Sequence, residues 1–183
     1  MKNKHLITGI SVAAAVVCIA GVIAFFYYSN RISYNGSFPA GVRAKVVLER
    51  DDSGTPVIMA KEFGDAYFGL GFLHAQDRYA MMEYFRAAAA GYSARIIGKD
   101  GKVLDRLSRA VDFAGKARGI AGRVGEPYTG YLADYAHGVN EARRRLHLHD
   151  TVPRDWSAAD IIAVLALREW CNAFLNNREL LFA

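Results

Sequence analysis

Three short motifs of this 183-residue chain contain residues that could do chemistry. Each of them departs from the pattern that the chemistry requires. His147, His149 and Asp150 offer two imidazoles and a carboxylate to a metal ion, but alternate residues at a helix end have neither HExxH nor CxxC spacing. The run GYSAR at 91–95 lacks the last glycine of the Gly-x-Ser-x-Gly turn that exposes a nucleophilic serine. The glycines at 69–71 begin a dinucleotide-binding fingerprint whose third glycine is absent. Structural roles are expected for all three.

A larger group of charged and amide side chains lies on one otherwise apolar predicted helix. Its members are Gln76, Asp77, Arg78, Glu83 and Arg86. Buried charges need partners, because an uncompensated charge away from water costs several kcal/mol. These residues are therefore predicted to form an ion-pair and hydrogen-bond network that fixes the helix in place, as scaffold and not as chemistry.

The helix that carries these groups is predicted to run from Asp65, its cap, to about Ala90, where Gly91 follows. Gly69 and Gly71 lie inside it. Glycine costs about 1 kcal/mol relative to alanine in a helix interior, so two glycines need a packing reason. We expect another backbone to cross closely there.

The remaining pattern predicts an α+β chain that is mostly helical. Residues 44–50 and 56–60 read as two strands of a hairpin, and 100–125 as a short helix with loops. A further helix is predicted from Pro127 to about His147. The last helix is predicted to begin after Ser157, with Asp160 completing a capping box.

The N-terminus carries an uncharged apolar run of 23 residues at 6–28, which as a helix is roughly 34 Å long, enough to cross a bilayer core. A signal peptide is the alternative, but its apolar region is shorter. The prediction is a membrane anchor at 1–28 with a transmembrane helix at 6–28, a stalk at 29–41 and a folded segment at 42–183. Lys2 and Lys4 predict a cytoplasmic N-terminus, an inner-membrane location and a periplasmic or extracellular main part.

The net charge of +5 raises the question of a nucleic-acid partner, with Arg143, Arg144 and Arg145 as its focus. Consecutive residues on a helix point about 100° apart, so three arginines do not make one stripe. A solvated helix end is the favoured interpretation, and no nucleic-acid partner is expected.

The segment DAYFGLGFLHAQDRYAMMEYFRAAAAGYSARIIG at 65–98 resembles the penicillin acylase (penicillin amidase) family of N-terminal nucleophile hydrolases. ERDDSGTPVIMA at 49–60 and YLADYAHGVNEA at 131–142 extend the similarity in the same order. The resemblance implies the smaller, or alpha, chain of an αββα sandwich, completed by a larger chain from the same precursor or an adjoining reading frame. The nucleophilic serine and its free α-amine would belong to that larger chain, with no catalytic residue in this one.

The function that the resemblance implies is the N-terminal, non-nucleophile portion of a membrane-anchored amidohydrolase that cleaves linear amide bonds of small acylated substrates. It also implies that Glu179 is a calcium ligand, with most of the other ligands on the larger chain. Substrate-binding positions do not transfer. Apolar groups expected to meet an acyl group or the larger chain are Trp170, Phe174, Phe68 and Phe72. The alternatives are a truncated, non-catalytic remnant and a membrane-tethered helical interaction module.

Overall fold

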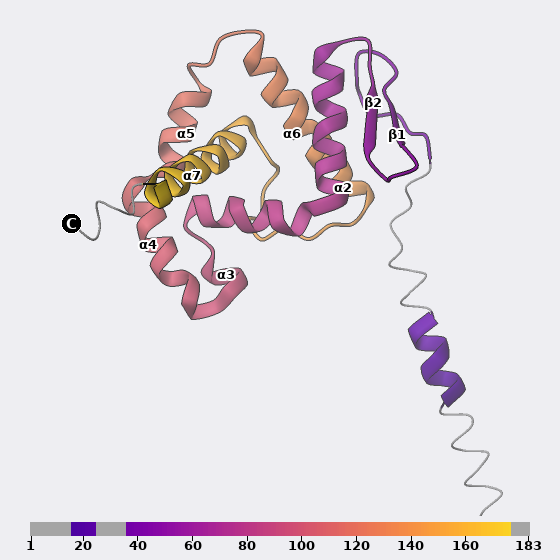
Figure 1. Cartoon of the computed structure of the whole chain (residues 1–183), viewed down its shortest axis with the longest axis horizontal. Helices are drawn as coiled ribbons and strands as arrows, with labels where there is room; N and C mark the ends of the chain where they lie inside the picture. The colour runs from indigo at the N-terminus through magenta and orange to yellow at the C-terminus, as the bar shows by residue number, and fades with distance from the viewer. Residues whose placement is uncertain (1–15, 25–35, 177–183) are drawn as a thin grey trace, which may run out of the picture. The chain divides into compact units, whose positions relative to one another are not determined.

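The computed structural model describes residues 16–24 and 36–176 of the chain (Figure 1). These residues divide into two compact units, Met1–Phe38 and Pro39–Ala183. In the first unit residues 16–24 are helical. The second unit is mostly helical and has a small two-stranded sheet, as the sequence predicts for this part of the chain.

The transmembrane helix predicted at 6–28 is wrong. The helix described in that region covers the nine residues 16–24, which rise roughly 14 Å, about half of a bilayer core. No helix in either described range is both long and apolar enough to cross a membrane. This finding also contradicts the predicted single-pass inner-membrane location. Much of the predicted stalk at 29–41 lies outside the described residues.

The sheet is the predicted hairpin of β1 (Val47–Arg50) and β2 (Pro56–Met59). The strands are antiparallel, with Val47 opposite Met59 and Arg50 opposite Pro56. Asp51 closes the turn, since its carboxylate accepts hydrogen bonds from the Ser53 and Thr55 amides at 3.0 and 2.8 Å. No other sheet occurs among the described residues, so the αββα sandwich that the resemblance implies does not form within them.

The long helix α2 (Phe63–Ala90) bends at Arg78, whose φ of −146° and ψ of 30° are not helical (Figure 1). It ends as predicted at Gly91, which has a φ of 76°. The predicted cap at Asp65 is wrong, because the helix begins two residues earlier. The Asp65 carboxylate instead accepts from the backbone amides of Arg43 and Ala44 at 3.0 and 2.8 Å, which fixes the segment that leads into β1.

Helix α6 (Tyr128–Arg145) crosses the first half of α2 at backbone contact. A Cβ on Gly71 would lie 2.1 Å from the Tyr135 carbonyl oxygen, and one on Gly138 would lie 2.0 Å from that of Phe68. The close backbone crossing predicted from Gly71 is therefore confirmed. Gly69 faces the hairpin, where its Cβ would lie 2.9 Å from the Leu48 side chain.

The second half of α2 packs against a separate helical group. This group contains α3 (Ala94–Ile97), the 3₁₀ turn η1 (Gly98–Gly101), α4 (Lys102–Val111), α5 (Phe113–Ala121) and α7 (Ala158–Asn176). Ala88, Phe113, Ala163 and Leu167 lie in its core, and α5 and α7 run side by side (Figure 1). Residues 100–125 are thus more helical than predicted. Asp112, at a φ of 58°, separates α4 from α5 and caps α5 through the Gly115 amide at 3.0 Å.

Candidate functional site

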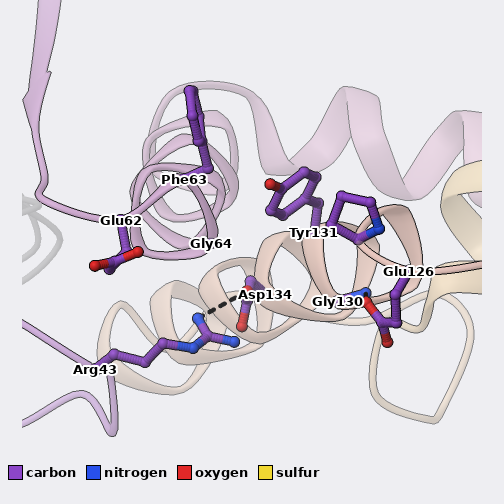
Figure 2. A pocket seen from close by; sticks show the side chains of 9 residues that line it. Arg43, Glu62, Phe63, Gly64, Glu126, Gly130, Tyr131 and Asp134 are labelled. Carbon is purple, nitrogen blue, oxygen red and sulfur yellow. Dashed lines mark hydrogen bonds and ion pairs between the residues drawn. The ribbon is translucent and has the colours of Figure 1, made fainter.

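An open pocket of about 240 Å³ lies between the first turns of α2 and α6 and the segment that precedes β1 (Figure 2). Its lining brings together one cation, three carboxylates and two aromatic rings. The lining residues are Arg43, Glu62, Phe63, Gly64, Glu126, Pro127, Gly130, Tyr131 and Asp134. Glu62 and Phe63 begin α2, whereas Tyr131 and Asp134 lie one and two turns into α6.

An ion pair forms the floor of this pocket. Arg43 Nη1 donates to Asp134 Oδ2 at 2.9 Å (Figure 2). It also lies 3.7 Å from Asp65 Oδ1. The hydrogen bond and charge of Asp134 raise the pKa of Arg43 above its ordinary value. Gly64 makes room for the pair, because a Cβ there would lie 2.2 Å from Asp134 Oδ2. The pair therefore ties the segment before β1 to both helices.

Aromatic rings make the opposite wall of the pocket. Tyr131 stacks on Tyr67 with ring centroids 4.8 Å apart, and Phe63 and Tyr128 each lie 6.3 Å from the Tyr131 ring. Phe63 is 75% exposed and Tyr128 is 66% exposed. Aromatic faces beside carboxylates suit a cationic or amide-bearing group. The lining has no serine, threonine, cysteine or histidine, so it lacks the usual groups for nucleophilic attack on an amide.

A second polar pair lies between the same two helices. His74 Nδ1 is 2.9 Å from the Tyr135 hydroxyl. Burial, with Arg78 adding to it, lowers the pKa of His74, and burial raises the pKa of Tyr135 to about 12. Both side chains are therefore neutral at pH 7. The pair is half-buried against α6.

A buried charge network joins α2 to α7. Arg86 is 1% exposed and Glu83 is 2% exposed. Arg86 Nη1 donates to Glu83 Oε1 at 2.9 Å, and Arg86 Nε lies 3.3 Å from Asp160 Oδ1. Glu83 also accepts from the Trp156 indole at 2.7 Å. The predicted network is thus confirmed for Glu83 and Arg86, with α7 as the element that it fixes.

Gln76 and Asp77, two other members of the predicted network, accept hydrogen bonds from the hairpin. Arg50 Nη2 donates to Asp77 Oδ1 at 2.5 Å and to Gln76 Oε1 at 3.3 Å. Arg78, the remaining member, is exposed at the bend of α2. The charged and amide residues that lie close together in sequence therefore form two groups, one on each side of the bend in α2.

Asp160 fixes the start of α7. Its carboxylate accepts from the Ser157 amide at 2.9 Å and from the Ser157 hydroxyl at 2.7 Å, which is the Asp160 half of the predicted capping box. Burial favours a higher pKa for Asp160, but hydrogen bonds from Arg154 and Ser157 and the charge of Arg86 outweigh it and lower the pKa below its ordinary value. Asp160 is therefore ionised at neutral pH.

The apolar side chains predicted to meet a ligand or partner differ in how far the structure buries them. Phe68 and Phe72 are 3% and 6% exposed, so that prediction is wrong for them: they pack inside this chain. Trp170 is partly buried, and its ring centroid lies 6.2 Å from that of Phe113. Phe174 lies outside the part of the chain whose side chains are described.

The proposed metal ligands remain a prediction. Glu179 lies outside the described residues. Within 16–24 and 36–176, no group of three or more His, Cys, Asp or Glu side chains could hold a metal ion. Asp150, which neighbours His147 and His149 in sequence, accepts hydrogen bonds from the Tyr79 hydroxyl and from Arg143.

Comparison with known proteins decides the family. Residues 45–181 match the penicillin amidase family model. The chain belongs to the penicillin amidase family. The match covers the hairpin, the buried charge network and every residue of the pocket lining except Arg43.

Relatives of this penicillin amidase segment are much longer proteins. Acyl-homoserine lactone acylase QuiP of Pseudomonas syringae pv. tomato is 32% identical over 68% of this chain and 15% of its own length. Penicillin acylase 2 proenzyme of Pseudomonas sp. strain SE83 is 37% identical over 55% of this chain and 13% of its own. Penicillin G acylase of Escherichia coli is 25% identical over 76% of this chain and 15% of its own.

A solved structure has the same fold. The thermostable penicillin G acylase from Alcaligenes faecalis matches with a TM-score of 0.56 and 22% identity. The match covers 67% of this chain and 70% of that chain. This chain and the solved chain are therefore of comparable length.

Sequence patterns did not identify the pocket. Arg43 and Asp134 are 91 residues apart and stand in unrelated patterns. One usable signal was present, since Phe63, Tyr67, Tyr128 and Tyr131 recur at helical spacings of three and four. That spacing predicts an aromatic face on each helix, but not that the two faces meet.

Proposed function

We propose that this chain is the N-terminal, non-nucleophile portion of an amidohydrolase that adds water across the C–N bond of linear acyl amides. The proposal rests on the family match at 45–181 and on the shares of two relatives' lengths that this chain covers. The segment spans 15% of a full-length acylase but 70% of a separately solved acylase chain. That contrast supports one short chain that works with a longer one, and the word "proenzyme" in one relative's name agrees with it.

The longer chain would supply the nucleophilic serine and the groups that stabilise the developing oxyanion. The part played by this chain is to form a wall of the substrate cavity and to brace the longer chain. The buried Glu83, Arg86 and Asp160 network supports this role, because it fixes α7 rigidly against α2. A rigid support is what an acyl-binding surface needs, since small displacements of a bound substrate reduce the rate strongly.

The substrate class follows from the relatives. Acyl-homoserine lactones and penicillins both carry an acyl group on an amide nitrogen, and the names of the relatives refer to both. We expect the full-length protein to release the amine from an N-acyl amide of one of these two kinds. Calcium would be shared between the chains, with Glu179 contributing one carboxylate.

Amine release by the full-length gene product tests this function. A panel of N-acyl-homoserine lactones of increasing chain length and of penicillins would be incubated with the purified protein, and the free amine measured with an amine-reactive dye. Turnover of any member, with intact-mass detection of two chains, supports the proposal. A folded full-length protein that releases no amine from the panel overturns it.

Calcium needs its own measurement. Glu179→Gln should weaken calcium binding by the full-length protein about tenfold or more, because a neutral amide replaces a charged oxygen donor. Glu169→Gln is the matched control, since Glu169 is an exposed carboxylate on α7 that pairs with Arg168. Equal calcium affinity in both variants and the wild type would remove Glu179 as a ligand.

A further inference from the structure

The pocket between the first turns of α2 and α6 contains two carboxylates without a paired cation. Arg43, the cation of the lining, forms its hydrogen bond with Asp134. Glu62 and Glu126 are both exposed, and neither forms a salt bridge with any residue of 36–176. Glu126 accepts from the Gly130 amide at 3.3 Å, and the Glu62 side chain does not cap α2. Both carboxylates can therefore accept hydrogen bonds from a ligand.

The charge balance of the pocket is negative. The hydrogen bond and charge of Asp134, followed by the charges of Asp65 and Glu62, raise the pKa of Arg43. Helices α2 and α6 both begin at the pocket, and Arg43 with two helix N-termini of roughly half a charge each supplies about two positive charges. Four carboxylates oppose them, the fourth being that of Glu126. The excess of negative charge attracts a cation.

Aromatic rings lie beside these carboxylates. The rings of Phe63 and Tyr131 have centroids 6.3 Å apart and planes tilted by 56°. Tyr131 is held in place by its stacking on Tyr67, whereas Phe63 is 75% exposed. In the view of Figure 2, the Phe63 and Tyr131 rings lie between Glu62 and Glu126. A cation within about 6 Å of a ring centroid is attracted by the ring face.

The combination of charge and rings selects one kind of cation. A bare ion interacts with the carboxylates but has no carbon to pack on the rings. An alkylammonium ion uses both features, because its N–H groups donate to carboxylates and its methylene groups pack on aromatic faces. The volume of about 240 Å³ lies just below the range of about 300–1,000 Å³ for drug-sized ligands, so it suits a small molecule.

We propose that this pocket binds a small organic ammonium ion, held by Glu62 and Glu126 and by the rings of Phe63 and Tyr131. All four side chains line the same pocket of this chain. The proposal therefore goes beyond the proposed function and does not depend on amide hydrolysis.

The test measures binding of n-butylammonium to the full-length gene product by ligand-observed NMR titration at pH 7 in a low-salt buffer. Alkylamines are protonated there, as the lysine side chain with its ordinary pKa of about 10.4 shows. n-Butanol has the carbon chain without the charge, and the ammonium ion has the charge without the carbon chain. We expect n-butylammonium to bind at millimolar concentrations and at least tenfold more tightly than either. Absence of binding, or equal affinity for the ammonium ion, overturns the proposal.

The carboxylates are tested by Glu62→Gln with Glu126→Gln, which removes both charges and keeps an oxygen that accepts from the Gly130 amide. This variant should bind n-butylammonium at least tenfold more weakly. Glu49→Gln with Glu169→Gln makes the same change at two exposed carboxylates outside the lining and should bind like the wild type. Equal losses in the two variants would mean an effect of net charge alone and would overturn the proposed site.

The rings are tested by Phe63→Leu, which keeps an apolar side chain but removes the aromatic face. It should weaken binding at least threefold. Phe85→Leu is the matched control, because Phe85 is a 43% exposed ring of α2 outside the lining. Circular dichroism checks that each variant is folded, and Glu62→Gln alone replaces the double variant if the latter is not. Wild-type affinity in Phe63→Leu contradicts the aromatic contact, and amine release by the wild type judges the proposed function separately.

Discussion

At the residue scale, Arg86 and Glu83 act mainly on main-chain atoms of another segment. Glu83 Oε2 accepts from the Thr151 and Val152 amides at 2.8 and 3.2 Å. Arg86 Nη2 donates to the carbonyl oxygens of Arg154 and Asp155 at 2.8 and 2.9 Å. The two side chains thus satisfy four backbone groups that have no helix or strand to pair with.

Arg86→Leu should destabilise the second unit strongly. Removal of the guanidinium leaves the Glu83 and Asp160 carboxylates buried without their shared cation, which costs about 3–5 kcal/mol. Arg168→Leu is the matched control, because Arg168 is exposed and pairs with its neighbour Glu169; its effect should stay within about 0.5 kcal/mol. Urea unfolding followed by circular dichroism measures both, and equal effects would contradict the role of Arg86.

Ionisation of Asp160 should make the free energy of unfolding of the second unit depend on pH. Its pKa in the folded state is lowered, so its contribution is complete above about pH 5 and is lost as the pH falls below about 4, through the folded pKa. Asp160→Asn should reduce the free energy of unfolding at pH 7, and the difference from wild type should shrink towards pH 3. The exposed Asp100→Asn serves as control. A difference independent of pH would argue against the assigned ionisation.

At the scale of the elements, the contact of α2 with α6 depends on two glycines that allow the backbones to touch. Gly71 faces the Tyr135 carbonyl and Gly138 faces the Phe68 carbonyl. Phe68 and Phe72, which lie close to these contacts in sequence, are both buried. Because each glycine meets main-chain atoms of the other helix, no side-chain rearrangement can relieve an added methyl group.

Gly138→Ala should therefore destabilise the unit by about 1–3 kcal/mol, since its new methyl group would overlap the Phe68 carbonyl 2.0 Å away. Gly119→Ala in α5 is a matched change, because nothing lies within 4 Å of the new methyl group. It should stabilise by up to about 1 kcal/mol through helix propensity. Thermal unfolding of both variants gives the comparison, and shifts of the same sign would contradict this packing.

Local patterns predicted most of these elements. The hairpin, the bodies of α2, α6 and α7, the stop at Gly91 and the close approach at Gly71 follow from periodicity and from glycine placement. The break between α4 and α5 was missed, because Asp112 supplies a positive φ that is usually associated with glycine. The bend of α2 at Arg78 was also missed, since no proline or glycine marks it.

Fewer features of the candidate site than of the helices and strands could be predicted from the sequence. The buried pair of Glu83 with Arg86 was predictable because an apolar helix cannot bury charges singly. Its partners Trp156 and Asp160 come from a distant segment, and the ion pair of Arg43 with Asp134 joins two patterns with no common period. The prediction for the apolar run at 6–28 was wrong for another reason: length and hydropathy predicted one long helix, whereas the described helix covers 16–24.

At the scale of the whole molecule, apolar groups remain uncovered on several elements. Phe63 and Tyr128 are exposed near the pocket, Met81 and Phe85 along α2, and Val103 on α4. Such groups are scattered on most protein surfaces, but here they occur in a segment that spans 15% of a relative. These are groups that the longer chain of the proposed assembly can cover.

If this chain works with a longer one, as proposed, the longer chain should raise its thermal stability. A partner present at about 100 times its dissociation constant contributes about 2.7 kcal/mol, which corresponds to about 5–10 °C in the unfolding midpoint of a unit of this size. Differential scanning calorimetry of this chain alone and together with the longer chain measures the shift. An unrelated protein at the same concentration is the control, and the absence of any shift would count against a shared assembly.

The hydrogen bonds from α2 to the backbone at 151–155 have a consequence for how the sequence of this loop can change. Hydrogen bonds to amides and carbonyls do not depend on side-chain identity, so exposed positions of this loop can change in sequence without loss of these bonds, whereas Val152 is buried and Arg154 pairs with Asp160. Pro153, whose ring is exposed, is the natural place for such diversification and for an engineered insertion. A residue substituted at this position would be displayed on a backbone whose path stays the same.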